Sequence, residues 1–196
     1  MTVKSAAWLA VLLLFGASTQ CHAQAKSVAG RSLLEWSSEL SSKSRTRRLR
    51  AALTLPSFGA EAVVPLVGAL EHADPGVVYW SASGLGDLAH KSARTKPVLA
   101  RLKALLKHKS IGVRLAAGFA LCRLGETRTG LAVLTGGLQH AQRGVACAAA
   151  DFLARIGPPA AAAVPALQQA AKHSDYHVKG AANEALKRIR DVKEGK

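Results

Sequence analysis

Apolar residues recur along the chain in a unit of 32 to 36 residues, which we align on four valines, Val77, Val113, Val145 and Val178. The positions seven, eleven and fourteen residues before each valine are all apolar. They are Val63, Leu66 and Leu70; Leu99, Leu102 and Leu106; Leu131, Leu134 and Leu138; and Val164, Leu167 and Ala171. Steps of three and four residues bring side chains to one face of an α-helix. Each unit therefore predicts a first helix, a short turn and a second helix that begins near the valine.

A fifth unit precedes these four. Its anchor is Arg47, thirty residues before Val77, and its preceding apolar positions are Leu33, Trp36 and Leu40. Phe58 and Gly59 occupy its closing positions. A charged anchor is typical of a terminal repeat, which has no neighbour to cover one of its faces.

Helix boundaries follow the same register. Three residues before the anchors stand Ser44, Asp74, Ser110, Gln142 and Asp175, and four of these five can cap the second helix. Gly59, Gly125 and Gly157 are expected to end second helices in a left-handed conformation. Pro97 and the pair Pro158 and Pro159 are expected to begin the following helices. Pro56 and Pro65 fall inside predicted helices and should kink or shorten them.

Small residues follow the anchors, at Ala116, Ala117, Ala148, Ala149, Ala181 and Ala182, and permit close helix packing. With this pattern, residues 31–192 resemble HEAT repeats of the phycobilisome-lyase-like type, most closely in DPGVVYWSASGLGDLA, KSIGVRLAAGFALCRLG and GPPAAAAVPALQQAAKHSDYHVKGAANEALKRI. The VVYW and GL residues and the Pro-rich last unit also resemble the HEAT tails of secreted bacterial sulfatases. The resemblance implies an all-α, right-handed α-solenoid of about five helical hairpins whose second helices line the concave face.

Residues 1–25 have the features of a secretory signal peptide. Lys4 precedes an apolar run from Ala6 to Phe15, and Ala23, Gln24 and Ala25 form a small-x-small cleavage site, so we expect cleavage after Ala25. The run is shorter than the roughly 20 residues that span a bilayer, which disfavours an uncleaved anchor. Lipidation of Cys21 is disfavoured because Gln20, and not a small residue, precedes it. We expect an exported protein, periplasmic or secreted, from a bacterium.

The mature chain divides into a linker at 26–30, the solenoid at 31–192 and a basic tail at 193–196. The whole chain carries a net charge of +15, and removal of the signal peptide takes away only Lys4, which leaves +14. No other segment is apolar for long enough to suggest a membrane span. Two cysteines remain after cleavage, too few for a disulfide framework, so the fold must depend on its own core.

Motifs for catalysis are absent from the sequence. The resemblance to sulfatase tails carries over no active-site residue, because the chain lacks the Cys/Ser-x-Pro-x-Arg motif from which sulfatases make their nucleophile. Metal-dependent HEAT hydroxylases carry His-Glu pairs, and the chain has no His-Glu dipeptide. We predict no catalytic residue, no metal and no cofactor.

Histidines stand five residues before four of the anchors, at His72, His108, His140 and His173. A metal-binding or pH-sensing ladder is one interpretation. Equivalent residues of neighbouring hairpins should lie about 9–10 Å apart, which is too far for two imidazoles to share one ion. We therefore favour single histidines that cap free carbonyl groups at the end of each first helix.

The remaining candidates are two cysteines and an aromatic pair. Cys122 and Cys147 are offset by about 10 Å along parallel helices, beyond disulfide reach, so we expect free thiols. Tyr79 and Trp80 could offer a sugar-stacking platform, but Trp80 falls on the core side of its helix, and we favour core packing.

Basic residues also form columns. Arg48, Arg114 and Lys179 follow their anchors by one residue, and Arg123, Arg155 and Arg188 follow by ten. We expect all six on the exposed side of the second helices, where they either form a binding stripe for a partner or polyanion or are only a solvated face.

The sequence thus favours a non-catalytic binding or scaffolding module whose concave face holds a protein partner or an anionic polysaccharide. A purely structural assembly subunit is the alternative. An enzyme of this fold that acts on nucleic acid, or a relative of the lyases, is a third class, which export disfavours.

Overall fold

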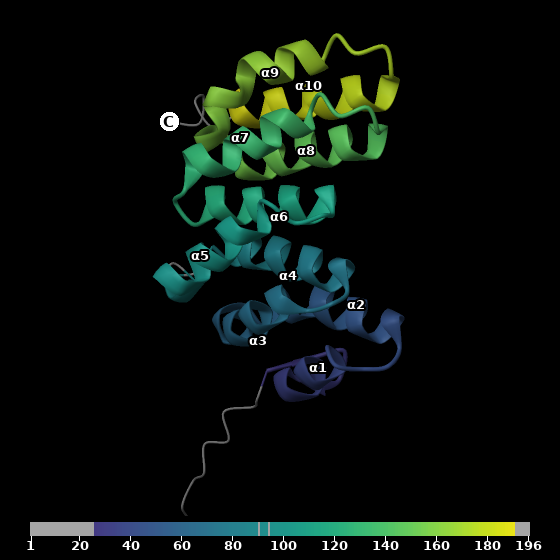
Figure 1. The fold of residues 1–196 in the computed structure, drawn as a ribbon, viewed down its shortest axis with the longest axis vertical. Coiled ribbons are helices and arrows are strands. Elements are labelled where there is room, and N and C mark those ends of the chain that lie inside the picture. Colours follow the sequence, from purple (N-terminus) through teal and green to yellow (C-terminus); the bar gives the residue numbers. More distant parts are fainter. Residues whose placement is uncertain (1–25, 90, 94, 191–196) are drawn as a thin grey trace, which may run out of the picture.

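A computed structural model describes residues 26–89, 91–93 and 95–190, which form an elongated stack of α-helices (Figure 1). The described residues confirm the all-α class and the stacked, solenoid arrangement. The signal peptide predicted for residues 1–25 and the basic tail at 193–196 lie outside the described residues.

Five helical hairpins follow one another along the stack, as predicted. Their helices are α1 (Leu33–Glu39) and α2 (Arg45–Thr54); α3 (Val63–Gly68) and α4 (Pro75–Leu88); α5 (Lys96–Leu105) and α6 (Ile111–Arg123); α7 (Thr127–Gly137) and α8 (Arg143–Ile156); and α9 (Val164–Ala170) and α10 (Tyr176–Arg190). Short 3-10 turns lie at Leu55–Ala62, Ala69–Glu71, Lys91–Ala93 and Pro158–Ala163. We call the odd-numbered helices the A layer and the even-numbered helices the B layer.

The repeat register is confirmed by burial. Val77 and Val113 are 0% exposed, Val178 is 1% exposed, and Val145 is half-buried. The residues eleven positions before these anchors, Leu66, Leu102, Leu134 and Leu167, are all 0% exposed. The apolar columns found in the sequence are therefore the core between the two layers.

Helix boundaries agree with the predicted positions. Ser44, Asp74, Ser110 and Gln142 are the N-cap residues of their helices. A side-chain bond to the helix forms at Asp74, which accepts from the Gly76 N–H at 2.9 Å, and at Asp175, which accepts from the His177 N–H at 2.8 Å. The predicted side-chain caps at Ser44 and Ser110 do not form. Positive φ angles of 72°, 100° and 70° are found at Gly59, Gly125 and Gly157. With ψ angles of −137° and −141°, Gly59 and Gly157 lie outside the left-handed helical region that was expected. Regular α2 ends at Thr54, just before Pro56, as expected for a helix shortened by proline.

Glycine brings α6 and α7 into backbone contact. A Cβ atom at Gly130 would lie 2.2 Å from the Gly118 carbonyl oxygen and 2.5 Å from the Cys122 sulfur. Neither distance is possible for real atoms, so the crossing requires glycine at position 130. A Cβ at Gly86 on α4 would similarly lie 2.5 Å from the ring of Phe119.

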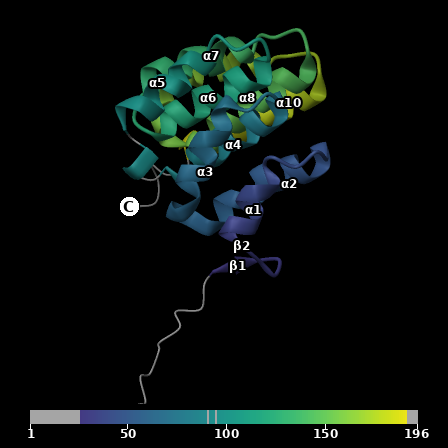
Figure 2. The same cartoon turned by 60° about the horizontal axis from the view of Figure 1, so that its bottom comes forward.

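The predicted linker at 26–30 is instead part of a small β-hairpin. Strands β1 (Ser27–Val28) and β2 (Arg31–Ser32) pair antiparallel at the free end of the stack, next to α1 (Figure 2). The indole N–H of Trp36 donates to the Val28 carbonyl oxygen at 2.9 Å and fixes the hairpin to α1. The prediction failed because two-residue strands are too short to produce an alternating pattern.

One helical run among the described residues, Arg45–Glu71, is long and apolar enough to cross a membrane by length and composition. It is not one continuous helix, because the backbone leaves the helical region at Gly59, with φ 72° and ψ −137°. The run turns there and supplies the second helix of the first hairpin and the first helix of the second hairpin.

Candidate functional site

A histidine closes the corner between the A and B helices in four of the five hairpins. Its Nδ1 accepts a hydrogen bond from the backbone N–H two residues later, at 2.8 Å for His72, 3.0 Å for His108, 3.1 Å for His140 and 2.9 Å for His173. Asn and Asp close turns with the same two-residue spacing. Each histidine acts singly, but the predicted role as a carbonyl cap was wrong, since the bonded nitrogen is an acceptor.

Arginines provide the carbonyl caps that were predicted for the histidines. The guanidinium of Arg114 donates to the carbonyl oxygens of His108 at 2.7 Å and Lys109 at 3.2 Å. Arg48 donates to the carbonyls of Ser42 and Lys43, and its guanidinium also pairs with Asp74 at 3.0 Å. The expectation that Arg48 and Arg114 are exposed was therefore wrong: both are half-buried and bonded within the fold.

Asp74 is the carboxylate that pairs with the arginines of this corner. Burial raises the pKa of its carboxyl, but hydrogen bonds from Arg48 and the Gly76 N–H, with the nearby Arg45 charge, outweigh burial and lower the pKa overall. The group is thus held as a carboxylate. It pairs with both Arg45 and Arg48, which would otherwise be available to a ligand.

Arg123 and Arg155 are also held inside the fold, although both were expected to be exposed. Arg123 donates to the Gly86 carbonyl oxygen at 3.2 Å. Arg155 on α8 pairs with Asp87 on α4 and donates to the Ser83 hydroxyl at 3.3 Å. Because α6 lies between α4 and α8 in the stack, the Arg155 side chain must cross α6 to reach them (Figure 1).

Aromatic rings lie beneath this crossing. The Arg155 guanidinium carbon is 4.4 Å from the ring centre of Phe119 and 5.1 Å from that of Phe152. Phe119 and Phe152 stack at 4.8 Å, and Tyr79 reaches Phe152 at 6.1 Å between ring centres. The centre of the B-layer face is therefore filled by side chains. Arg155 and these rings thus cover the middle of the B-layer face, over α4, α6 and α8.

Two of the six predicted basic residues remain exposed on α10. Lys179 has no bonded partner within the described residues, and Arg188 pairs with Glu184 at 2.7 Å. The six residues accordingly do not form a continuous stripe. Their part in polyanion binding stays a prediction, which the geometry supports at these two positions only.

The third hairpin carries a basic surface that the repeat register did not reveal. Residues 96–123 contain seven Lys and Arg and no Asp or Glu. Arg101 and Lys103 are paired with carboxylates of neighbouring hairpins, at 3.1 Å and 3.0 Å. Lys96, Lys107 and Lys109 are exposed and have no bonded partner in the described part of the chain. A count of charged residues in each hairpin would have revealed this surface from the sequence. Alignment of the repeats by register position obscures it.

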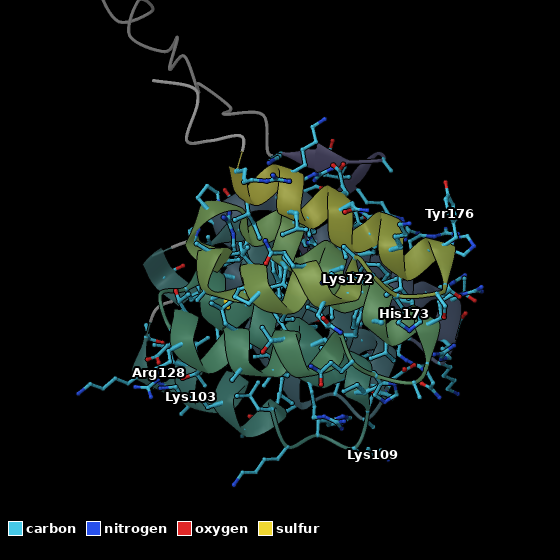
Figure 3. All side chains as sticks on the ribbon, turned by 90° about the horizontal axis from the view of Figure 1, so that it is seen from above. Lys103, Lys109, Arg128, Lys172, His173 and Tyr176 are labelled. Carbon is cyan, nitrogen blue, oxygen red and sulfur yellow. The ribbon has the colours of Figure 1, made fainter. Side chains whose placement is uncertain are left out.

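This surface runs along the A layer. Lys103 and Arg128 project from one side of the stack and Lys109 projects from the A-layer face in a view along the stack (Figure 3). Ten residues of α5 span about 15 Å, so the charges at its two ends can be contacted by one extended segment. We call Lys96, Arg101, Lys103, Lys107 and Lys109 the third-hairpin basic surface.

Nucleophilic and metal-binding groups are sparse. Cys122 and Cys147 are free, as predicted, and burial raises the pKa of Cys122 to about 12. No group of three or more His, Cys, Asp or Glu that could hold a metal occurs among the described residues. Tyr79 and Trp80 are half-buried against the core with rings perpendicular at 4.9 Å, in agreement with the predicted packing role.

Comparison with known proteins agrees with the architecture. Residues 99–187 match HEAT repeats. The complex of CpcE and CpcF of phycocyanin lyase from Nostoc sp. PCC7120 is similar, with 23% identity and a TM-score of 0.56 over 85% of this chain and 68% of that chain. A designed armadillo repeat protein in complex with a (KR)4 peptide has 20% identity and a TM-score of 0.53, over 81% and 82% of the two chains.

No curated protein sequence matches the chain. Identities of 20–23% establish the fold and nothing about chemistry. Residues 99–187 are thus similar to HEAT repeats, and the described residues as a whole form an all-α solenoid with a HEAT- and armadillo-like arrangement.

Proposed function

We propose that this protein is a non-catalytic, exported scaffold that binds an acidic segment of a protein partner through the third-hairpin basic surface. The observation that carries the proposal is the charge of this hairpin. Its three exposed lysines have no carboxylate partner in the described residues, and its two ion pairs are surface pairs, which contribute little and exchange easily. Acidic side chains of a partner can replace them.

The fold supports a protein partner. The two solved relatives named above are, by their descriptions, a complex of two proteins and a complex with a peptide. The peptide in the second complex consists of Lys and Arg. A chain of net charge +15 repels such a peptide, so charge complementarity favours the opposite composition here.

Export and the absence of catalysis rest on other observations. The charged start, apolar run and small-x-small site of residues 1–25 support export, as does the resemblance to tails of secreted sulfatases. A binding role without catalysis is supported by the sparse chemistry of the described residues, where the most deeply buried thiol, Cys122, is held protonated.

The experiment measures binding of a fluorescent alternating Asp-Glu peptide of sixteen residues by anisotropy. We expect saturable binding that weakens with salt, and no binding of a (KR)4 peptide. Reversal of three charges, in Lys96→Glu, Lys107→Glu and Lys109→Glu combined, should weaken binding at least about tenfold, since three attractive rim contacts become repulsive.

A matched control changes the same net charge elsewhere. Lys172→Glu, Lys187→Glu and Arg190→Glu combined alter three exposed basic residues of the fifth hairpin. This variant should weaken binding less than about threefold, because exposed charges more than a Debye length away are screened. Equal weakening by both variants would mean that net charge alone attracts the peptide. Tighter binding of heparin than of the peptide would replace the protein partner by an anionic polymer.

A further inference from the structure

A cavity of about 370 Å³ lies at the N-terminal end of the stack, between the β-hairpin and the first helical hairpin. It is lined by Ala29, Arg31, Trp36, Glu39, Arg47 and Arg50. Three of these six residues are arginines, and the cavity is separate from the third-hairpin basic surface. The β-hairpin that forms one wall lies next to α1 at this end (Figure 2).

Two of the three guanidinium groups in this cavity are unpaired. Arg31 pairs with Glu39 at 3.0 Å and lies over the Trp36 ring, 5.4 Å from its centre. Arg47 and Arg50 are exposed and make no hydrogen bond or ion pair with any described residue. Three residues apart on α2, they share one face of the helix. The cavity therefore carries an uncompensated charge of two.

Both unpaired arginines depart from the repeat. The position of Arg47 is Val in the other four hairpins, and the position of Arg50 is Trp80, Ala116, Ala148 and Ala181. In those hairpins both positions are apolar, whereas the first helical hairpin has no preceding helical hairpin among the described residues. A polar residue at each position would be enough for solubility. Solubility alone does not require that both positions be arginine and that both line the same cavity.

The opposite wall is held in a strained conformation. Ala29 has a φ of 51°, which is uncommon for a residue with a side chain and is unfavourable for it. The Trp36 bond to the Val28 carbonyl and the Arg31 pair with Glu39 fix this turn over the cavity. The shape of the cavity is thus built into the fold.

We propose that this cavity binds a phosphoryl group as its dianion. A guanidinium donates two parallel bonds to an oxyanion, and a carboxylate has two oxygens and one charge, enough for one such group. A phosphoryl dianion has three acceptor oxygens and close to two charges at neutral pH, which match Arg47 and Arg50 together. The volume lies within the range that holds a small organic ligand, so a phosphate monoester fits the cavity better than the bare ion.

The experiment is isothermal titration at constant ionic strength with glycerol 2-phosphate, inorganic phosphate, inorganic sulfate and acetate. We expect saturable binding of both phosphates and no binding of acetate. Monoester affinity should rise between pH 5 and pH 7, as the second proton with a pKa of about 6 is lost, while sulfate affinity stays constant. Tighter binding of glycerol 2-phosphate than of inorganic phosphate would identify an ester as the ligand, and tighter binding of inorganic phosphate would identify the free ion.

Variants test the assignment in both directions. Arg47→Gln and Arg50→Gln should each weaken phosphate binding about tenfold, the usual effect of losing a hydrogen bond to a charged group. Glu39→Gln should strengthen it, because it removes the only carboxylate that lines the cavity. Arg128→Gln is the matched control and should change nothing, because Arg128 on α7 is exposed and has no bonded partner among the described residues.

Several results would overturn the proposal. They are equal binding of acetate, equal weakening by Arg128→Gln, or no saturable phosphate binding by wild-type protein. Melting temperatures of the variants without ligand verify that each is folded. Because none of these residues belongs to the third-hairpin basic surface, loss of phosphate binding is distinguishable from loss of peptide binding.

Discussion

Replacement of Arg155 by leucine tests whether the closed centre of the B-layer face stabilises the fold. The side chain is 27% exposed, and its guanidinium contacts two aromatic rings at 4.4 Å and 5.1 Å. These contacts contribute about 0.5–1 kcal/mol each. The pair with half-exposed Asp87 adds about 0.5 kcal/mol, and the bond to Ser83 about 1 kcal/mol. Leucine keeps an apolar cover over the rings, so we expect a net loss of about 2 kcal/mol.

Arg188→Leu is the control, because Arg188 occupies the same register position on α10. Its side chain is 55% exposed and pairs only with Glu184, four residues earlier on the same helix. Such pairs contribute about 0.3–0.5 kcal/mol. Register alone makes the two arginines equivalent, whereas the structure makes them differ about fourfold in stabilisation.

Urea unfolding followed by circular dichroism measures the difference. We expect Arg155→Leu to lower the melting temperature by about 4–8 °C as well. Because Arg155 joins the second and fourth hairpins, its loss should also broaden the transition, as neighbouring repeats unfold less cooperatively. If Arg155→Leu is no less stable than Arg188→Leu, the guanidinium is merely solvated and the cation–π contacts contribute nothing.

Three further predictions follow from local geometry. His108→Ala should lower the free energy of unfolding by about 1 kcal/mol, and His108→Asn should restore most of it because the amide oxygen can replace Nδ1; equal losses in the two would contradict the corner bond. Cys147 should react with iodoacetamide before Cys122, and prompt labelling of both thiols in folded protein would refute this order. Since burial raises the pKa of the Cys122 thiol from 9.0 to about 12, the free energy of unfolding should fall as pH rises between these values. Intact mass of protein from its native host should show Lys26 as the first residue, and full-length protein would exclude cleavage after Ala25.

The hairpins could be predicted from sequence because burial imposes a periodic pattern on each helix separately. Leu66, Leu102, Leu134 and Leu167 recur at one register position and are all fully buried. Glycines with positive φ could be placed for the same reason, since a helix end needs such a residue regardless of its neighbours. These features depend on interactions within one unit or with the next.

The basic residues could not be assigned, because their surroundings come from distant parts of the chain. Arg155 meets Asp87 sixty-eight residues earlier, across an intervening helix. Arg123 meets a backbone carbonyl of α4, which no sequence pattern marks. Register identifies the face of a helix on which a side chain begins, and a side chain as long as arginine can end on another hairpin.

The sequence placed the four histidines correctly, at the corners between the A and B helices, but it predicted the wrong hydrogen-bond role for them. Their signal was the spacing of two residues between each histidine and the N-cap position, as between His72 and Asp74. From the sequence we expected each imidazole to cap the carbonyl end of the preceding helix, because a protonated imidazole interacts favourably with the negative end of the helix dipole. The geometry shows that Nδ1 accepts a hydrogen bond from a backbone N–H, whereas a carbonyl cap needs a donor.

The backbone contact between α6 and α7 limits how far the hairpins can be exchanged as modules. At the position of Gly118 the other hairpins carry Ala52, Ala82, Ala150 and Asn183, and at that of Gly130 they carry Ser32, Ala62, Val98 and Ala163. Any of these at position 130 would force the two helices apart. A shuffled array that separates the third hairpin from the fourth would lose this junction. The third and fourth hairpins should therefore be engineered as one unit of four helices.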